Sequence, residues 1–169
     1  MPHHVLPDYD IHKGTIAVLS AAAIEYSSIV LEPDQTLYIR KPPLQLIKEA
    51  CLEGGSTYDG RREAVTHLTG AQNKVPIPVN PREYLYAFPT HSPQLFECNW
   101  LFYHHIHKIQ PKPKTPGTSI VTFKTRKDPL TLDVSHHSLQ KQIQRTAYCI
   151  VRFSMTHLQR LLWDESLPV

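Results

Sequence analysis

Short apolar runs separated by turn-forming residues fill the first forty positions, and this pattern predicts antiparallel β structure. The runs are rich in Val, Ile, Leu and Thr, and they cover residues 15–19, 28–31 and 36–40. Alanine-rich, Glu-Pro-Asp and Pro-Pro segments separate or follow them. We therefore expect three neighbouring strands arranged as a meander.

Two short helices are predicted in the middle of the chain. Residues 44–52 place their apolar side chains near one side of a helix, and the glycine pair that follows would end it. A strand is the alternative for this segment. Residues 60–69 predict the second helix, with Thr57 or Asp59 as its N-cap and Gly70 as its stop. The chain thus changes from β to α structure here.

Closely spaced prolines then favour extended structure, with a short strand at 83–88. Residues 99–109 alternate in part between apolar and polar positions, which predicts another strand. Residues 110–117 are rich in Pro and Lys and resemble a linker. Residues 118–134 predict a hairpin whose turn, near residues 126–129, carries charge. The aromatic residues expected in the core are Phe88, Phe96, Trp100, Phe102 and Phe123.

The clearest helix begins near Ser135 or Ser138, either of which can accept a first-turn N–H. One stripe of this helix is apolar and is expected to face the core; it consists of Leu139, Ile143, Ala147 and Ile150. The opposite stripe is basic with one aromatic, and consists of Lys141, Arg145, Tyr148 and Arg152. Such a stripe is often only a solvated face. Here no acid lies between Val134 and Trp163, and this absence favours a surface for phosphates.

Positive charge is concentrated in the last part of the chain. Residues 98–163 contain ten Lys/Arg and two acids, a net charge of about +8, whereas the residues before them sum to about −3. Clustered cations gain free energy by releasing the counterions condensed on phosphate groups. The distribution therefore predicts a polyanion, and nucleic acid above all, as the partner.

Other kinds of site find little support. Within the predicted strand, His105 and His107 would lie on one side with the spacing of two metal ligands, and His136–His137 could supply a third ligand, but no carboxylate lies near them in sequence. A histidine-based metal nuclease is the one enzyme alternative. The loop at 54–62 lacks the Lys-Ser/Thr of a Walker loop. We expect no metal, no cofactor and no enzymatic activity.

Three widely spaced cysteines are an odd number, which favours buried thiols in a reducing cytoplasm over a disulfide framework. The longest apolar run is too short to cross a bilayer, so no membrane partner is expected. A chain of 169 residues suits one well-buried core, and we expect a single domain, residues 1–169. The fold class predicted is α+β: a largely antiparallel sheet, two short central helices and a C-terminal amphipathic helix across the sheet.

Several segments follow one another in the order and at nearly the spacing of the ComK family, the competence transcription factors of Gram-positive bacteria. Taken together they are specific, and the chain resembles this family from about residue 14 to about residue 153. The segments are Thr15-Ile-Ala-Val-Leu, Pro43-Leu-Gln-Leu-Ile, Cys51-Leu-Glu-Gly-Gly-Ser-Thr-Tyr-Asp-Gly-Arg-Arg, Lys74-Val-Pro-Ile-Pro-Val-Asn-Pro, Ala87-Phe-Pro-Thr-His-Ser-Pro, Cys98-Asn-Trp100 and Gln142-Ile-Gln-Arg-Thr-Ala.

The resemblance implies a cytoplasmic, nucleoid-associated activator of DNA-uptake genes. It implies binding to paired AT-rich boxes of double-stranded DNA from the minor groove, as a homo-oligomer, with RNA polymerase as a further partner. From charge and expected exposure we assign DNA contacts to Arg61, Arg62, Lys124, Arg126, Lys127, Lys141, Arg145 and Arg152. The first five should reach the groove or its phosphates, and the last three should hold the flanking backbone. All are expected to form one electropositive patch.

One departure concerns the end of the chain. Family members continue past the position equivalent to Phe153 with a basic tail, used in part to dock an adaptor that delivers them to a Clp protease. Residues 154–169 diverge here and end acidic and apolar, so adaptor-mediated degradation and full activation lose their support. The alternative function is therefore a shortened relative that acts as an interaction partner or decoy of a full-length activator.

Overall fold

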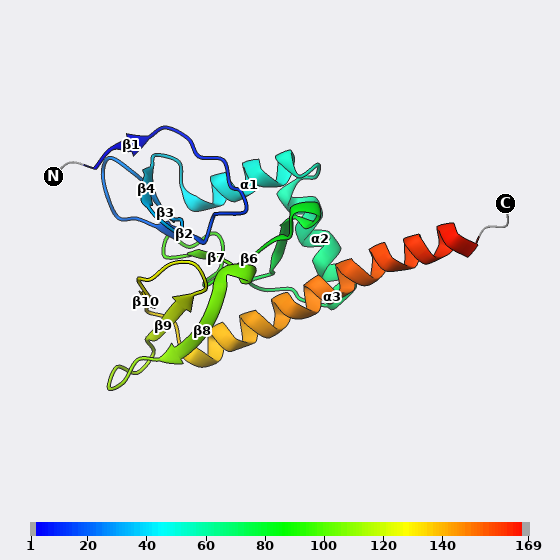
Figure 1. Cartoon of the computed structure of the whole chain (residues 1–169). Coiled ribbons are helices and arrows are strands. Elements are labelled where there is room, and N and C mark those ends of the chain that lie inside the picture. Colours follow the sequence, from blue (N-terminus) through cyan, green and yellow to red (C-terminus); the bar gives the residue numbers. More distant parts are fainter. Residues whose placement is uncertain (1–2, 167–169) are drawn as a thin grey trace.

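The computed structural model describes residues 3–166, and within its last helix the side chains of residues 155–161 and 163–166 lie outside the described part. The described chain forms a mixed α+β fold with two β-sheets and three α-helices (Figure 1). Most neighbouring strands are antiparallel, as the sequence predicted.

The larger sheet has seven strands in the order β1-β4-β3-β2-β7-β6-β5. Strand β1 runs parallel to β4 at one edge, and the other pairs are antiparallel. Strands β2, β3 and β4 confirm the predicted meander. The strands are β1 (Val5–Leu6), β2 (Ala17–Ser20), β3 (Ser28–Leu31), β4 (Thr36–Ile39), β5 (Ile77–Asn80), β6 (Leu85–Pro89) and β7 (Trp100–Phe102).

The smaller sheet has three antiparallel strands in the order β10-β9-β8. Strand β8 (Ile106–Pro111) pairs with β9 (Ser119–Phe123), and β9 pairs with β10 (Leu130–Leu132). The predicted hairpin over residues 118–134 is confirmed as β9 and β10.

Both faces of the larger sheet are covered by other elements. Successive residues of a strand point to opposite sides, so neighbouring residues show what covers each face. Trp100 and Phe102 of β7 belong to a buried cluster with side chains of the two central helices. Leu101, between them, belongs to a second cluster with residues of the smaller sheet and Leu139. The smaller sheet and the central helices therefore lie on opposite faces of the larger one.

The central helices follow the predicted caps. Helix α1 (Pro43–Glu53) ends at Gly54, where an added Cβ would lie 2.5 Å from the Val79 carbonyl oxygen, so only glycine fits against β5. Helix α2 (Tyr58–Thr69) begins at Thr57, whose hydroxyl oxygen accepts the Gly60 N–H at 2.9 Å. It ends at Gly70 in the left-handed region with φ 81°. The strand alternative for residues 44–52 is thereby excluded.

The prediction of one strand over residues 99–109 is wrong. The segment is divided into β7, a 3-10 turn, η2 (Tyr103–His105), and β8. Strand β7 pairs with β2 and β6 in the larger sheet, whereas β8 pairs with β9 in the smaller one. The turn redirects the chain from one layer to the other. A second 3-10 turn, η1 (Pro81–Glu83), precedes β6.

Four of the five predicted core aromatics are buried, and Phe96 is the exception. Phe88, Trp100, Phe102 and Phe123 are at most 7% exposed, whereas Phe96 is 65% exposed. Phe96 lies in the irregular connection between β6 and β7, where no neighbouring strand covers it. Its aromatic character therefore does not reflect a place in the core.

The three cysteines are buried and free, as predicted. Burial raises the pKa of the Cys51 thiol to about 11 and that of Cys149 to about 12. Burial also raises the pKa of Cys98. All three thiols therefore stay protonated at neutral pH and act as small apolar side chains.

Helix α3 (His136–Ser166) runs beneath the sheets and continues past α2 (Figure 1). The divergent residues 154–169 begin on this helix, and apart from the exposed Ser154 and Leu162 their side chains lie outside the described part. None of the described helices combines the length and apolar character needed to cross a membrane.

Candidate nucleic-acid interface

Helix α3 is anchored at its start by a side-chain cap. Ser135, just before the helix, accepts the Ser138 N–H with its hydroxyl oxygen at 3.1 Å. Leu139, one turn later, is fully buried against the smaller sheet. Cap and anchor together fix which side of the helix faces solvent, and Lys141 and Tyr148 lie on that exposed side.

The buried side of α3 is rotated from the predicted apolar stripe. Gln142 and Thr146 are buried, whereas Ala147 is only half-buried. The Gln142 amide can be buried because it donates to the carbonyl oxygens of Lys74, at 2.9 Å, and Pro89, at 2.7 Å. With this rotation Gln142 and Arg145 contact the loop between α2 and β5.

An open concavity of about 410 Å³ lies between α3 and that loop, residues 70–74. It is lined by cations from both sides, among them Lys74, Lys141 and Arg145, together with His137. Lys141 is exposed and forms no ion pair with a described residue. Two of the predicted DNA contacts thus share one hollow with a lysine that the sequence analysis did not select.

Three side chains hold the 70–74 loop by its carbonyl oxygens: Gln142, whose bond to Lys74 is given above, Arg62 and Arg145. Arg62 donates to Gln72 at 3.2 Å, and Arg145 donates to Asn73 at 2.6 Å. Carbonyl groups are neutral, so these hydrogen bonds satisfy guanidinium donors without cancelling their charge. Burial lowers the pKa of Arg145, but a guanidinium group stays protonated in proteins. The loop is therefore fixed in place and its surroundings stay positive.

A second concavity, of about 370 Å³, lies on the other side of α3. Lys108 and Lys124, from β8 and the end of β9, line it together with His107. Gln140 and Ile143 of α3 form its opposite wall. The first turns of α3 therefore form a ridge between two hollows that both carry lysines.

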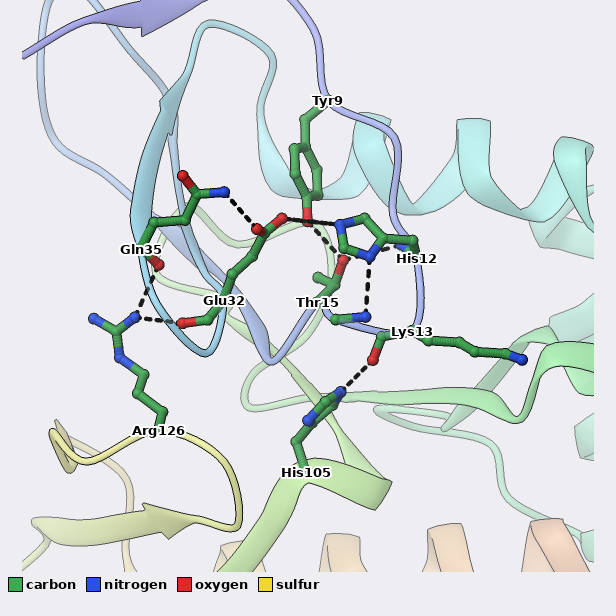
Figure 2. A network of polar contacts seen from close by, with 9 residues as sticks. Tyr9, His12, Lys13, Thr15, Glu32, Gln35, His105 and Arg126 are labelled. Carbon is green, nitrogen blue, oxygen red and sulfur yellow. Dashed lines mark hydrogen bonds and ion pairs between the residues drawn. The ribbon is translucent and has the colours of Figure 1, made fainter.

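Arg126 does not join this surface. Its guanidinium donates to the carbonyl oxygens of Glu32, at 2.6 Å, and Gln35, at 2.9 Å (Figure 2). It also donates to the Thr36 hydroxyl oxygen at 2.7 Å. The turn between β9 and β10 is thus tied to the turn between β3 and β4 of the larger sheet. The expectation that all eight cations form one patch is not met.

A buried carboxylate lies beside this tie. Glu32 is 8% exposed and accepts hydrogen bonds from the Tyr9 hydroxyl at 2.5 Å and from Gln35 at 2.7 Å, and it pairs with His12 at 2.9 Å (Figure 2). Burial raises the pKa of Glu32, but these hydrogen bonds outweigh it and leave the pKa below its ordinary value. The network holds the N-terminal segment on the sheet.

The remaining candidates lie apart. Arg61 is half-buried and donates to the Gly54 carbonyl oxygen at 2.8 Å, so it closes the loop before α2. Lys127 is exposed in the β9–β10 turn. Arg152 is half-buried on α3, two turns beyond Arg145, and has a contact of its own. The structure brings together Arg62, Lys141 and Arg145, with Lys124 across the ridge.

The histidines considered as metal ligands serve other contacts. His105 lies in η2 rather than on a strand, and its ring is hydrogen-bonded to the Lys13 carbonyl oxygen at 2.6 Å. Burial, followed by the nearby Lys124, lowers the pKa of His104 below 6.5. No group of three or more His, Cys, Asp or Glu side chains suited to a metal ion is found among the described residues.

Sequence reasoning missed the lysines outside the predicted hairpin turn and helix. Lys74 was hidden in a proline-rich segment, and its placement depends on its left-handed backbone, with φ 48°. Lys108 could have been found, because it occupies an exposed position on β8. Lys112 and Lys114 are also exposed, but they lie in a segment whose composition resembles a linker.

Comparisons with known proteins identify the family that the chain matches. A family model described as "ComK protein" matches residues 6–157. The protein named Competence transcription factor from Bacillus subtilis (strain 168) is 32% identical over 149 residues, which are 88% of this chain and 76% of that protein. No solved structure is significantly similar to the chain.

Proposed function

Because the chain belongs to the ComK family, we propose that it is a DNA-binding regulator of competence genes. The observation that carries this proposal is the ridge of α3 with lysine-lined hollows on both sides. Lys124 and Lys141 form no ion pair with any residue that the structure describes, so their charge is available to an external anion. The phosphates of a duplex are anions spaced along a path, and a ridge with cations on both flanks suits them.

We further propose that the DNA is AT-rich and is approached from the minor groove. A narrow A-tract groove has enhanced negative potential that attracts Lys and Arg, and its width is read without a base-specific code. Lys74, Lys108, Lys124 and Lys141 would contact the phosphates beside the groove. Arg62 and Arg145 would add charge while they hold the 70–74 loop.

Fluorescence anisotropy with AT-rich and GC-rich duplexes of equal length, over a range of salt concentrations, tests this function. The doubly charge-reversed variant Lys124→Glu/Lys141→Glu should lose affinity by at least about 30-fold at 0.15 M salt, because two phosphate contacts are replaced by repulsion. The matched control reverses two exposed cations of the N-terminal half, Arg40→Glu/Lys48→Glu, and should bind nearly as tightly as the unaltered protein.

Salt-independent binding by the unaltered protein, or equal losses in both double variants, would contradict the proposal. Circular dichroism melting of each variant separates lost binding from lost folding. A competence-promoter reporter in cells that also contain an activator of the ComK family then distinguishes whether this chain is itself an activator or a decoy. An activator raises the reporter output, whereas a decoy lowers it.

A further inference from the structure

The loop between β8 and β9 is built from two successive tight turns. The Thr115 N–H donates to the Lys112 carbonyl oxygen, and the Thr118 N–H donates to that of Thr115, both at 3.3 Å. In each turn a proline holds the second position, Pro113 in the first and Pro116 in the second. Each third position has positive φ, as in type II turns. The segment that resembled a linker is therefore a preorganised structure.

This loop is also fully exposed and carries only positive charge. Residues 111–117 are all exposed, and the loop projects away from both sheets beyond the ends of β8 and β9 (Figure 1). Lys112 and Lys114 are its charged residues. Neither side chain forms a hydrogen bond or an ion pair with a residue in the described part of the chain. Two cations thus stand on a rigid projection with no internal role.

The third position of the first turn is occupied against its conformational preference. Lys114 has φ 60°, and the equivalent residue of the second turn is Gly117 with φ 77°. A non-glycine residue in this left-handed region costs roughly 1–2 kcal/mol, and Gly or Asn is favoured there. The lysine therefore weakens the turn that it forms, which indicates a use for its side chain outside the fold.

We infer that residues 112–117, named here the Lys-Pro loop, enter the minor groove of AT-rich DNA with Lys114 and Lys112 directed into it. This inference rests on the proposed function and names the element that reads the groove. Cations on a preordered loop bind with little loss of conformational entropy. The loop leaves the body close to the start of α3, since the Ser119 hydroxyl donates to the Val134 carbonyl oxygen at 2.6 Å. Loop and ridge can therefore follow one duplex.

The test is the variant Lys112→Gln/Lys114→Asn, which removes both charges and places a residue suited to left-handed backbone at position 114. Its melting temperature should equal or exceed that of the unaltered protein. Its affinity for an AT-rich duplex should fall on the order of 10- to 30-fold at 0.15 M salt, and the salt slope should decrease by about 1.8. Arg40→Gln/Lys48→Gln is the matched neutralised control and should leave the affinity and the salt slope unchanged.

Duplex chemistry separates the groove from the phosphates. Inosine·cytosine pairs lack the guanine amino group in the minor groove, where they resemble A·T pairs. The unaltered protein should bind an I·C duplex more tightly than the matching G·C duplex, and the loop variant should lose most of this difference. An unchanged affinity overturns the inference. A loss that is equal on all duplexes also overturns it, because the loop then touches phosphates only. Failure of the unaltered protein to bind any duplex would instead contradict the proposed function.

Discussion

The two ends of the smaller sheet carry similar charge but have opposite surroundings. At one end the β9–β10 turn places Arg126 against the larger sheet, where three oxygen acceptors hold its guanidinium; two of them, the Glu32 and Gln35 carbonyl oxygens, are seen in Figure 2. At the other end the Lys-Pro loop extends into solvent, and its lysines have no partner among the described residues (Figure 1). The same small sheet thus uses a cation for cohesion at one end and exposes cations at the other.

The difference teaches that acceptor geometry, and not charge alone, divides structural from interacting cations. Main-chain carbonyls left without partners in irregular turns attract guanidinium groups, because arginine offers five donors in a fixed fork. Lysine has three rotatable donors on a flexible stem and more often stays solvated. Arg61, Arg62, Arg126 and Arg145 all donate to carbonyl oxygens, whereas the side chains of Lys124, Lys127 and Lys141 donate to no carbonyl oxygen within the described part of the chain. The lysines are accordingly the better candidates for DNA.

The largest effect on stability is expected at the end of the smaller sheet that carries Arg126, from loss of a buried apolar side chain. Phe123, at the end of β9, is 7% exposed in the cluster between the two sheets. Phe123→Ala should lower the free energy of unfolding by about 3 to 4 kcal/mol, because a large buried side chain leaves a cavity. Urea denaturation measures the effect. A loss below about 1 kcal/mol would mean that the smaller sheet contributes little to the stability of the larger one.

Removing the tie itself should have an intermediate effect. Arg126→Ala leaves the Glu32 and Gln35 carbonyl oxygens without their donor and should cost about 2 kcal/mol in the free energy of unfolding. Affinity for DNA should hardly change, since the guanidinium faces the larger sheet. The exposed neighbour provides the control, because Lys127→Ala should leave stability unaltered. Lower affinity of Arg126→Ala with intact stability would return Arg126 to the DNA-binding surface.

The smallest effect on stability is expected from a change of pH, through a histidine of η2. Burial lowers the pKa of His105 below 6.5, against the opposing hydrogen bond to Lys13. A histidine with a depressed pKa binds fewer protons when folded, so its contribution to stability is complete above pH 6.5 and declines as the pH falls through the folded value. The Glu32 contribution is lost at lower pH, below 4.5. Denaturation at pH 7.5 and 5.5 should give a smaller difference in His105→Gln than in the unaltered protein. Equal differences would exclude His105 as a source.

Local pattern predicted most of the elements and little of the candidate surface. Periodicity sufficed for β3, the central helices and the β9–β10 hairpin, because each of these elements has a regular apolar pattern bounded by turn or capping residues. It failed at residues 99–109, where the strand alternation continues while the chain changes sheets at η2. Arg126 is held by the turn between β3 and β4, whereas Lys124 lines a hollow against α3. Both placements depend on elements outside the predicted hairpin. Such contacts leave no local signal.

Chemical labelling becomes simple because of the buried cysteines. Maleimide dyes and cleavage reagents attack exposed thiolates, and Cys51, Cys98 and Cys149 offer neither exposure nor thiolate at neutral pH. One cysteine introduced at Thr115, in the Lys-Pro loop, would therefore react against a silent background. A cleavage reagent attached there would cut the nucleotides nearest the loop and map its position on a promoter directly.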